Sequence, residues 1–365
     1  DFGPVAILNS PINTFNTTNQ TIFFNGSVTS PLGVTNISLI LDGIFNETNS
    51  SGINDTDYLF TKIIEDGDHN WTYESCNING CLNATTRNFT IDSINPEINV
   101  TSPTGIIDFH EINTNLSLNW TVSDEHLNSC WYDYNGTNVT DNQTNINITD
   151  SSNKNLTFYA NDTFGNLNSS FTSWDYLVFQ NSQTFNVNVF EGNLETFTAN
   201  ITVIGSNSVS VATLFYNGTP TVASFSSSGN DYFLSKIFQI PEVDTVTNIT
   251  FVWNVQLSGG QSINITPNNQ TISSLNLDDC SVNTVVLYNY TIVDEKNQTQ
   301  LTNTTSELNI NLLNAERQSF VTNFSMEYLV NPFAVCLNEN ISSSTFLLDS
   351  IVKYEAIGYA IEYYK

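Results

Sequence analysis

Four of the five cysteines carry the clearest chemical signal in the sequence. Cys76 and Cys81 flank a turn-forming Asn-Ile-Asn-Gly segment, so a disulfide between them would close a hairpin. Cys280 and Cys336 both lie near the end of the chain and form the second predicted pair. Zinc binding at Cys76 and Cys81 would need two more soft ligands at suitable spacing, which the sequence lacks. Two disulfides favour an oxidising, extracellular compartment.

The three histidines, His69, His110 and His126, are the natural candidates for acid-base chemistry. No His-Glu-x-x-His motif, Ser or Cys nucleophile signature or glycine-rich phosphate loop accompanies them. With 36 Asp and Glu residues, no carboxylate pair can be singled out as a glycosidase pair. We therefore expect surface histidines, no catalytic or cofactor-binding residues, and a protein that is not an enzyme.

Five aspartates in polar turns could hold a calcium ion at a domain edge, because Ca²⁺ prefers carboxylate oxygens. No EF-hand or nonapeptide spacing accompanies them, so solvated turn carboxylates are the simpler interpretation and Ca²⁺ stays an alternative. They are Asp55, Asp57, Asp66, Asp68 and Asp162.

Asn-x-Ser/Thr sequons are in excess: 30 of the 55 asparagines begin one, where composition alone predicts roughly 12. One interpretation is dense N-glycosylation of an exported protein. The other is structural, because residues i and i+2 of a strand share a face, and an Asn-rich and Thr-rich solvent face generates sequons automatically. The candidate glycosylation sites are Asn36, Asn70, Asn135, Asn217 and Asn289.

Charge excludes two classes of partner. The sequence has eight Lys and Arg residues and 36 Asp and Glu residues, so its formal net charge is 8 − 36 = −28. A charge of this sign would repel nucleic acid and anionic membranes. No run of 18 apolar residues is present, so we expect no membrane insertion within this sequence. The chain begins at Asp1 without the features of a signal peptide, which leaves room for a secretion signal or an anchor outside it.

The front of the chain repeats itself. Pro4–Pro11 matches Pro96–Pro103 at an offset of about 92 residues, each segment ending in Ser-Pro. A third copy is indicated because Asp57–Lys62 resembles Asp231–Lys236. Units of this size, with short alternating strands and Asn-Gly or Asp-Gly hairpin turns, are typical of Ig-like β-sandwiches.

The predicted fold class is therefore all-β: an extended multi-domain chain of tandem Ig-like β-sandwich domains. The expected boundaries give three Ig-like sandwiches over 1–93, 94–178 and 179–275, and a divergent sandwich, transthyretin-like or regulatory-like, over 276–365.

Aromatic residues are expected to form the cores of these sandwiches. Trp71, Trp120, Trp131 and Trp253 are the predicted core tryptophans, and Cys130 is expected to be buried beside Trp131 as a small hydrophobe.

The paired Ser-Pro openings and the closing Tyr159-Ala-Asn-Asp-Thr-Phe-Gly-Asn166 resemble tandem Ig-like repeat surface proteins of archaea, bacteria and their viruses. The resemblance covers roughly residues 1–275. It implies an architecture of stalks, fibres, lattices or adhesins more than an activity.

We therefore expect a non-catalytic extracellular structural or adhesive protein: a stalk, a fibre, or a filament or lattice subunit on a cell or virion surface. Self-association is the expected partnership, with a host-surface or matrix glycan or protein as a second partner class. The alternative is a carbohydrate-binding module or part of a carbohydrate-active protein, in which Trp131, Tyr132 and Tyr134 form an exposed aromatic patch.

Overall fold

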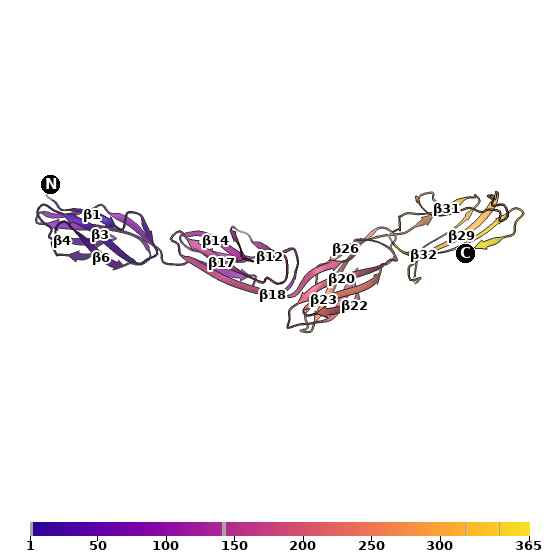
Figure 1. Cartoon of the computed structure of the whole chain (residues 1–365), viewed down its shortest axis with the longest axis horizontal. Helices are drawn as coiled ribbons and strands as arrows, with labels where there is room; N and C mark the ends of the chain where they lie inside the picture. The colour runs from indigo at the N-terminus through magenta and orange to yellow at the C-terminus, as the bar shows by residue number, and fades with distance from the viewer. Residues whose placement is uncertain (1–2, 141–143, 318, 343) are drawn as a thin grey trace. The chain divides into compact units, whose positions relative to one another are not determined.

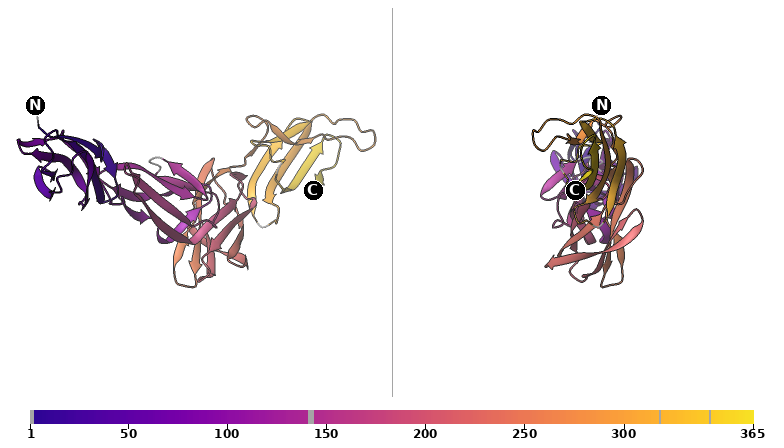
Figure 2. Two further views of the ribbon diagram at one scale, coloured as in Figure 1. Left: turned by 60° about the vertical axis from the view of Figure 1, so that its left-hand side comes forward. Right: turned by 90° about the vertical axis from the view of Figure 1, so that its right-hand side faces the viewer.

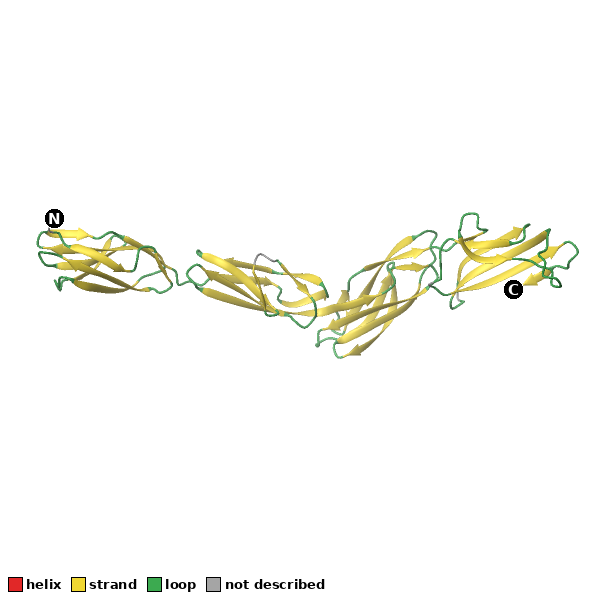
Figure 3. Cartoon of the chain, turned by 45° about the horizontal axis from the view of Figure 1, so that its top comes forward, coloured by secondary structure: helices red, strands yellow, loops and turns green. Residues whose placement is uncertain are grey.

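The computed structural model describes residues 3–140, 144–317, 319–342 and 344–365. In these ranges the chain consists of strands and loops, with no helix (Figure 3). The prediction of an all-β protein is confirmed. Nothing in the described ranges is a helix long and apolar enough to cross a membrane.

Contacts divide the chain into two compact units, each treated by itself below. The first comprises residues 1–105, 116–146 and 153–174, and the second comprises 106–115, 147–152 and 175–365.

The N-terminal sandwich of the first unit consists of two sheets that cover one core (Figure 1). One sheet has the order β1-β3-β6 and the other β2-β9-β7-β4-β5, with β8 paired to β7. The strands are β1 (Val5–Ser10), β2 (Phe15–Thr17), β3 (Thr21–Thr29), β4 (Asn36–Leu41), β5 (Ile44–Asn49), β6 (Thr56–Ile63), β7 (Gly67–Asn77), β8 (Gly80–Asn83) and β9 (Arg87–Ile91).

Aromatic rings from both sheets fill this core. Trp71 is fully buried, as predicted, and its ring centroid lies 5.0 Å from that of Phe24 on the opposite sheet. The Tyr73 hydroxyl, on β7, donates to the backbone carbonyls of Phe24 (2.9 Å) and Tyr58 (3.0 Å). These bonds join the two sheets from inside the core, where an unpaired hydroxyl would be costly.

The repeated Ser-Pro marks the point where the first strand of a repeat changes sheet. β1 pairs antiparallel with β3, and after the cis Ser10-Pro11 bond β2 pairs parallel with β9. The Arg87 guanidinium donates to the carbonyls of Leu8, Asn9 and Pro11 and so satisfies backbone acceptors that the change of sheet leaves unpaired. The second opening, Ser102-Pro103, is also cis.

Residues 97–184 form the next set of strands. Within the first unit, β10 pairs with β13, and β15, β14, β17 and the start of β18 form a four-stranded ladder. The strands are β10 (Glu97–Ser102), β11 (Gly105–Glu111), β12 (Thr114–Ser117), β13 (Asn119–Ser123), β14 (Leu127–Tyr134), β15 (Thr137–Thr140), β16 (Asn145–Ile148), β17 (Asn155–Asp162) and β18 (Leu167–Thr184).

Two of the four predicted core tryptophans are not buried. Tyr132, not Trp131, points into the core from β14, since Tyr132 is 1% exposed and Trp131 is half-buried. Alternation along the strand allows only one of the two neighbours inside. Trp131 instead stacks on Tyr159 of the adjacent strand, with ring centroids 5.4 Å apart. Trp120 is also half-buried, packed against Phe158.

The second unit begins its sheets with the far half of β18, whose residues Val178–Thr184 pair with β20. From there the strand order is β20-β23-β22-β21-β24-β26-β19, with β25 paired to β24. The strands are β19 (Asn188–Phe190), β20 (Leu194–Val203), β21 (Val209–Tyr216), β22 (Thr219–Ser228), β23 (Asp231–Gln239), β24 (Thr247–Leu257), β25 (Ser262–Asn264) and β26 (Asn268–Ser273). Trp253 is fully buried in this core, as predicted.

The C-terminal sandwich of the second unit has its own core, from Leu275 to Val352. Its sheets have the orders β27-β31-β28 and β30-β29-β32-β33, and β29 and β32 run side by side in Figure 2 in orange and yellow. The strands are β27 (Leu277–Asp278), β28 (Val285–Tyr290), β29 (Thr304–Asn314), β30 (Phe320–Tyr328), β31 (Phe333–Leu337), β32 (Phe346–Ala356) and β33 (Glu362–Tyr364). The four domain boundaries drawn from the sequence stay a prediction.

Gly26 is required by the close approach of β3 to the core. A Cβ added there would lie 2.8 Å from the Ile7 carbonyl oxygen and 2.9 Å from the Tyr73 ring. We predict that Gly26→Ala lowers the free energy of unfolding by about 1–3 kcal/mol through overpacking. Chemical denaturation monitored by tryptophan fluorescence measures it. Thr29→Ala, an exposed position on the same strand, is the control, and equal stability of the two variants would contradict the prediction.

Candidate functional site

An acidic cavity of about 630 Å³ lies in the first unit. Asp66 and Asp68, two of the five aspartates considered for Ca²⁺, line it, together with Asp92, Asp124 and His126. The other three aspartates do not line it. Asp162 instead accepts bonds from the backbone of Phe164 and Asn166 and stabilises its own turn.

His126 and Asp92 form the centre of this cavity. The imidazole Nδ1 lies 2.7 Å from Asp92 Oδ2, and Asp124 accepts a bond from the His126 backbone N–H (2.7 Å). One ligand atom from each of the three side chains lies within 4.8 Å of the others, a spacing that a divalent cation could bridge. In the structure, however, the imidazole and the Asp92 carboxylate bond each other.

Asp66 does not have the electrostatics of a glycosidase general acid. A general acid needs a raised pKa. Burial acts to raise the pKa of Asp66, but hydrogen bonds from Gln20 and Ser93 outweigh it and lower this pKa. The lining contains no Trp, Tyr or Phe ring on which a sugar could stack.

The other two histidines also have structural partners. His69 lies between Asp42 Oδ2 (2.8 Å) and the Glu65 carbonyl oxygen (3.0 Å). His110 stacks on Tyr176, with ring centroids 5.4 Å apart, and burial lowers the pKa of its imidazole. All three histidines are half-buried, more enclosed than the surface positions expected from the sequence.

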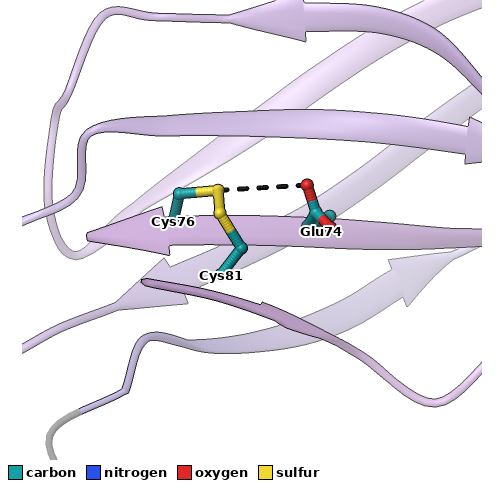
Figure 4. Close-up of side chains that lie close together, drawn as sticks. All are labelled: Glu74, Cys76 and Cys81. Atoms are coloured by element: carbon teal, nitrogen blue, oxygen red, sulfur yellow. Dashed lines mark hydrogen bonds between the residues drawn. A yellow bond between two sulfur atoms is a disulfide. The ribbon is translucent and has the colours of Figure 1, made fainter. Parts of the chain in front are cut away.

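The structure joins the two predicted cysteine pairs. Cys76 and Cys81 form a disulfide across the β7–β8 hairpin, beside Glu74 (Figure 4). Because disulfide sulfurs offer no thiolate, this group is not a metal site. Cys280 and Cys336 join β31 to the turn after β27. Cys130 is half-buried on β14 rather than buried, although it shares the strand face of the buried Tyr132.

The five candidate sequons differ in accessibility. Asn135, Asn217 and Asn289 are exposed, whereas Asn36 and Asn70 are half-buried. Asn135 and Asn217 each open an Asn-Gly turn and have positive φ values of 58° and 49°. These are the hairpin turns predicted from the sequence, and a glycan there would project from a loop tip.

The aromatic patch predicted at Trp131, Tyr132 and Tyr134 does not form, because Tyr132 lies in the core. Aromatic side chains gather elsewhere, in a groove of about 440 Å³ in the C-terminal sandwich, here called the tyrosine groove. Its rings are Tyr288 and Tyr290 from β28, Tyr354 from β32 and Tyr364 from β33.

The tyrosine groove lies between two sheets that do not close on each other. β28 is the end strand of one sheet and β33 the end strand of the other. Tyr364 lies opposite Val352 in the β32–β33 ladder, so both share the face that lines the groove. Sequence reasoning missed this site because the tyrosines on β28 and β33 do not show that these strands lie beside each other.

The hydroxyls of Tyr354 and Tyr290 stay protonated at neutral pH. A hydrogen bond to Glu362 (2.7 Å), burial and the charges of Glu362 and Glu295 raise the pKa of Tyr354 to about 12. Burial raises the pKa of Tyr290. Both hydroxyls can therefore act as hydrogen-bond donors.

No family profile matches the sequence, and no curated protein matches it. Among solved structures, the chain is similar to the titin I-band fragment I67-I69, with 11% identity and a TM-score of 0.42 over 74% of this chain and 97% of that one. It is also similar to the ICAM-5 D1-D4 ectodomain fragment, with 11% identity and a TM-score of 0.37 over 99% and 98%. Both are tandem Ig-domain structures, like the fold class described above, and the similarity concerns the fold alone.

The His126–Asp92 pair has a defined pH signature. The hydrogen bond to Asp92, with the charges of Asp92, Glu125 and Asp124, raises the pKa of His126 above 6.5. A raised folded-state pKa contributes stability that is fully present below the unfolded pKa and is lost as pH rises through the folded pKa. We predict that the loss of stability in His126→Gln is larger near pH 5.5 than near about pH 8.5.

Denaturant titrations of the wild-type chain and of His126→Gln across this pH range measure the difference in their free energies of unfolding. His110→Gln is the matched control, because a lowered pKa gives the opposite sign and its effect grows as pH rises. A pH-independent effect of His126→Gln would contradict the assignment.

Proposed function

We propose that this chain is a non-catalytic structural and adhesive array of Ig-like sandwiches on the outside of a cell or virion, acting as a stalk, a fibre, or a filament or lattice subunit. The proposal rests mainly on one observation: the chain combines tandem sandwiches with a surface whose polar side chains are largely Asn, Ser and Thr. Such a surface, at a net charge of −28 with few lysines, resists non-specific aggregation.

The disulfides support an extracellular location. Both link strands or turns within one sandwich, and such bonds persist in oxidising compartments. The exposed sequons at Asn135, Asn217 and Asn289 fit the same location, since N-glycans are added during export.

We predict that chain purified from its native source carries glycan mass, and that Asn135, Asn217 and Asn289 are occupied more fully than the half-buried Asn36 and Asn70. Intact mass before and after glycan release and reduction, with glycopeptide mapping, measures both. Negative-stain images of the same sample should show filaments or arrays. Unmodified, monomeric chains would argue for a secreted binding module instead.

Self-association has a candidate edge in β1. This strand pairs with β3 on one side only, carries no charged residue, and exposes Val5 and Ile7 to 60% and 61%. Natural proteins usually protect such an edge with lysine, proline or a bulge, because its unpaired backbone groups can accept a further strand. In β1 the bulge lies between Leu8 and Ser10, where Arg87 also bonds the carbonyls of Leu8 and Asn9, so this protection is at the end of the strand and not at Val5 and Ile7. Strand addition between copies at β1 is therefore part of the proposal.

We predict that Ile7→Lys shifts assembled chains towards monomers, since a charge on an edge strand opposes strand addition. Light scattering after size-exclusion chromatography measures the distribution. Val282→Lys, at an 81% exposed loop position, is the control with the same added charge. An equal change in both variants would mean that charge alone, not the β1 edge, governs assembly.

A further inference from the structure

The tyrosine groove presents rings that are held in place before any ligand arrives. Tyr290 stacks on Phe333, with centroids 5.2 Å apart, and Tyr288 stacks beside Tyr290 at 5.8 Å. On the other wall, the bond from Tyr354 to Glu362 fixes that ring. A site with fixed side chains loses little conformational entropy on binding.

Two of these rings are open to solvent at the rim of the groove. Tyr288 is 45% exposed and Tyr364 is 64% exposed, while Ile292 and Val352 below them are buried. Exposed aromatic faces above an apolar floor are unfavourable in water unless something covers them, and clusters of this kind mark binding surfaces.

The polar lining of the groove restricts the ligand class. It comprises the amides of Asn289 and Gln298, the Thr291 hydroxyl and the Glu295 carboxylate, with no lysine or arginine. An anion would meet no positive partner and one negative charge. A neutral ligand with many hydroxyl groups would find both hydrogen-bond donors and acceptors.

We propose that the tyrosine groove binds a neutral saccharide, whose apolar C–H faces stack on Tyr288 and Tyr364 while its hydroxyls bond the amides and the carboxylate. Burying a sugar face against an aromatic ring removes apolar area from water, as in other aromatic contacts. The inference rests on the proposed adhesive function and names the ligand class that one of its sandwiches recognises.

The saccharide has two possible sources. It can belong to a partner surface, or it can be the chain's own glycan, because Asn289 is itself a sequon asparagine in the groove lining. The chemistry of recognition is the same in both cases, so the experiment separates the sources.

The first arm uses the full chain produced without N-glycans. Neutral hexose and pentose oligosaccharides, including cellohexaose, maltohexaose, mannohexaose and xylohexaose, are titrated by calorimetry. We expect at least one to bind, and Tyr288→Ala and Tyr364→Ala each to weaken it about five- to tenfold through the lost stacking contact. Tyr363→Ala is the matched control, since Tyr363 is 63% exposed on the same strand but does not line the groove.

Three outcomes would overturn the proposal. The first is that none of the four oligosaccharides binds, and the second is that binding survives both groove substitutions. The third is that tetramethylammonium chloride binds in the groove and the sugars do not, which would indicate a cation-binding aromatic cage. Because both substituted tyrosines are exposed, we expect folding to be retained, and thermal unfolding of each variant checks it. Gln298→Ala, at an exposed position, tests the polar lining separately.

The second arm uses chain from the native source. If its own glycan fills the groove, the added oligosaccharide binds only after glycan release. If a partner glycan is the ligand, native and glycan-free chains bind equally. If the chain forms filaments but binds no sugar, this inference is refuted and the proposed function is not. If the chain is an unmodified monomer that binds sugar, the proposed structural array is refuted and the saccharide site in the groove is not.

Discussion

Closing two sheets over a shared aromatic core is the interaction on which the other features depend. Aliphatic side chains make up most of each core, and aromatic rings interleave with them and contact one another. Phe24 meets Trp71 at 5.0 Å in the N-terminal sandwich, and Phe197 meets Phe251 at 4.8 Å in the second unit. Aromatic pairs of this kind stabilise beyond the area they bury, and Tyr73 adds hydrogen bonds from one sheet to the other.

The same constraint explains why the tyrosine groove is in the C-terminal sandwich. There the stacked series Tyr328, Phe333, Tyr290 begins in the core and continues outward along β28 to Tyr288. β28 and β33 are the end strands of their sheets, so the last rings of the series line an open edge between the two sheets. A binding surface can thus arise as an extension of core packing past the point where the sheets separate.

The sequence predicted features that depend on local spacing. The Cys76–Cys81 hairpin and the Asn-Gly turns are both set by residues close together in the chain. Alternation also showed that Trp131 and Tyr132 must face opposite ways, but not which one enters the core. That choice depends on how β14 pairs with β17, a long-range register that period two alone does not specify.

Features that join distant segments could not be predicted from the sequence. Asp92 and His126 are 34 residues apart, and nothing in either segment indicates that they meet. The tyrosine groove requires β28 and β33 to end beside each other, which depends on the topology of the whole sandwich. In both cases the residue types were visible, but their convergence comes from the fold.

The scarcity of lysine and arginine also affects how proteases that cut after basic residues meet the folded chain. Before residue 295 there are four basic residues, Lys62, Arg87, Lys154 and Lys236, and each is half-buried. Arg87 is also bonded to three backbone carbonyls. Proteases that cut after basic residues need an exposed, extended loop. Among the described residues that precede Lys365, exposed basic positions outside strands are Lys296 and Arg317, so the shortage of basic residues also leaves the folded chain few sites for tryptic cleavage.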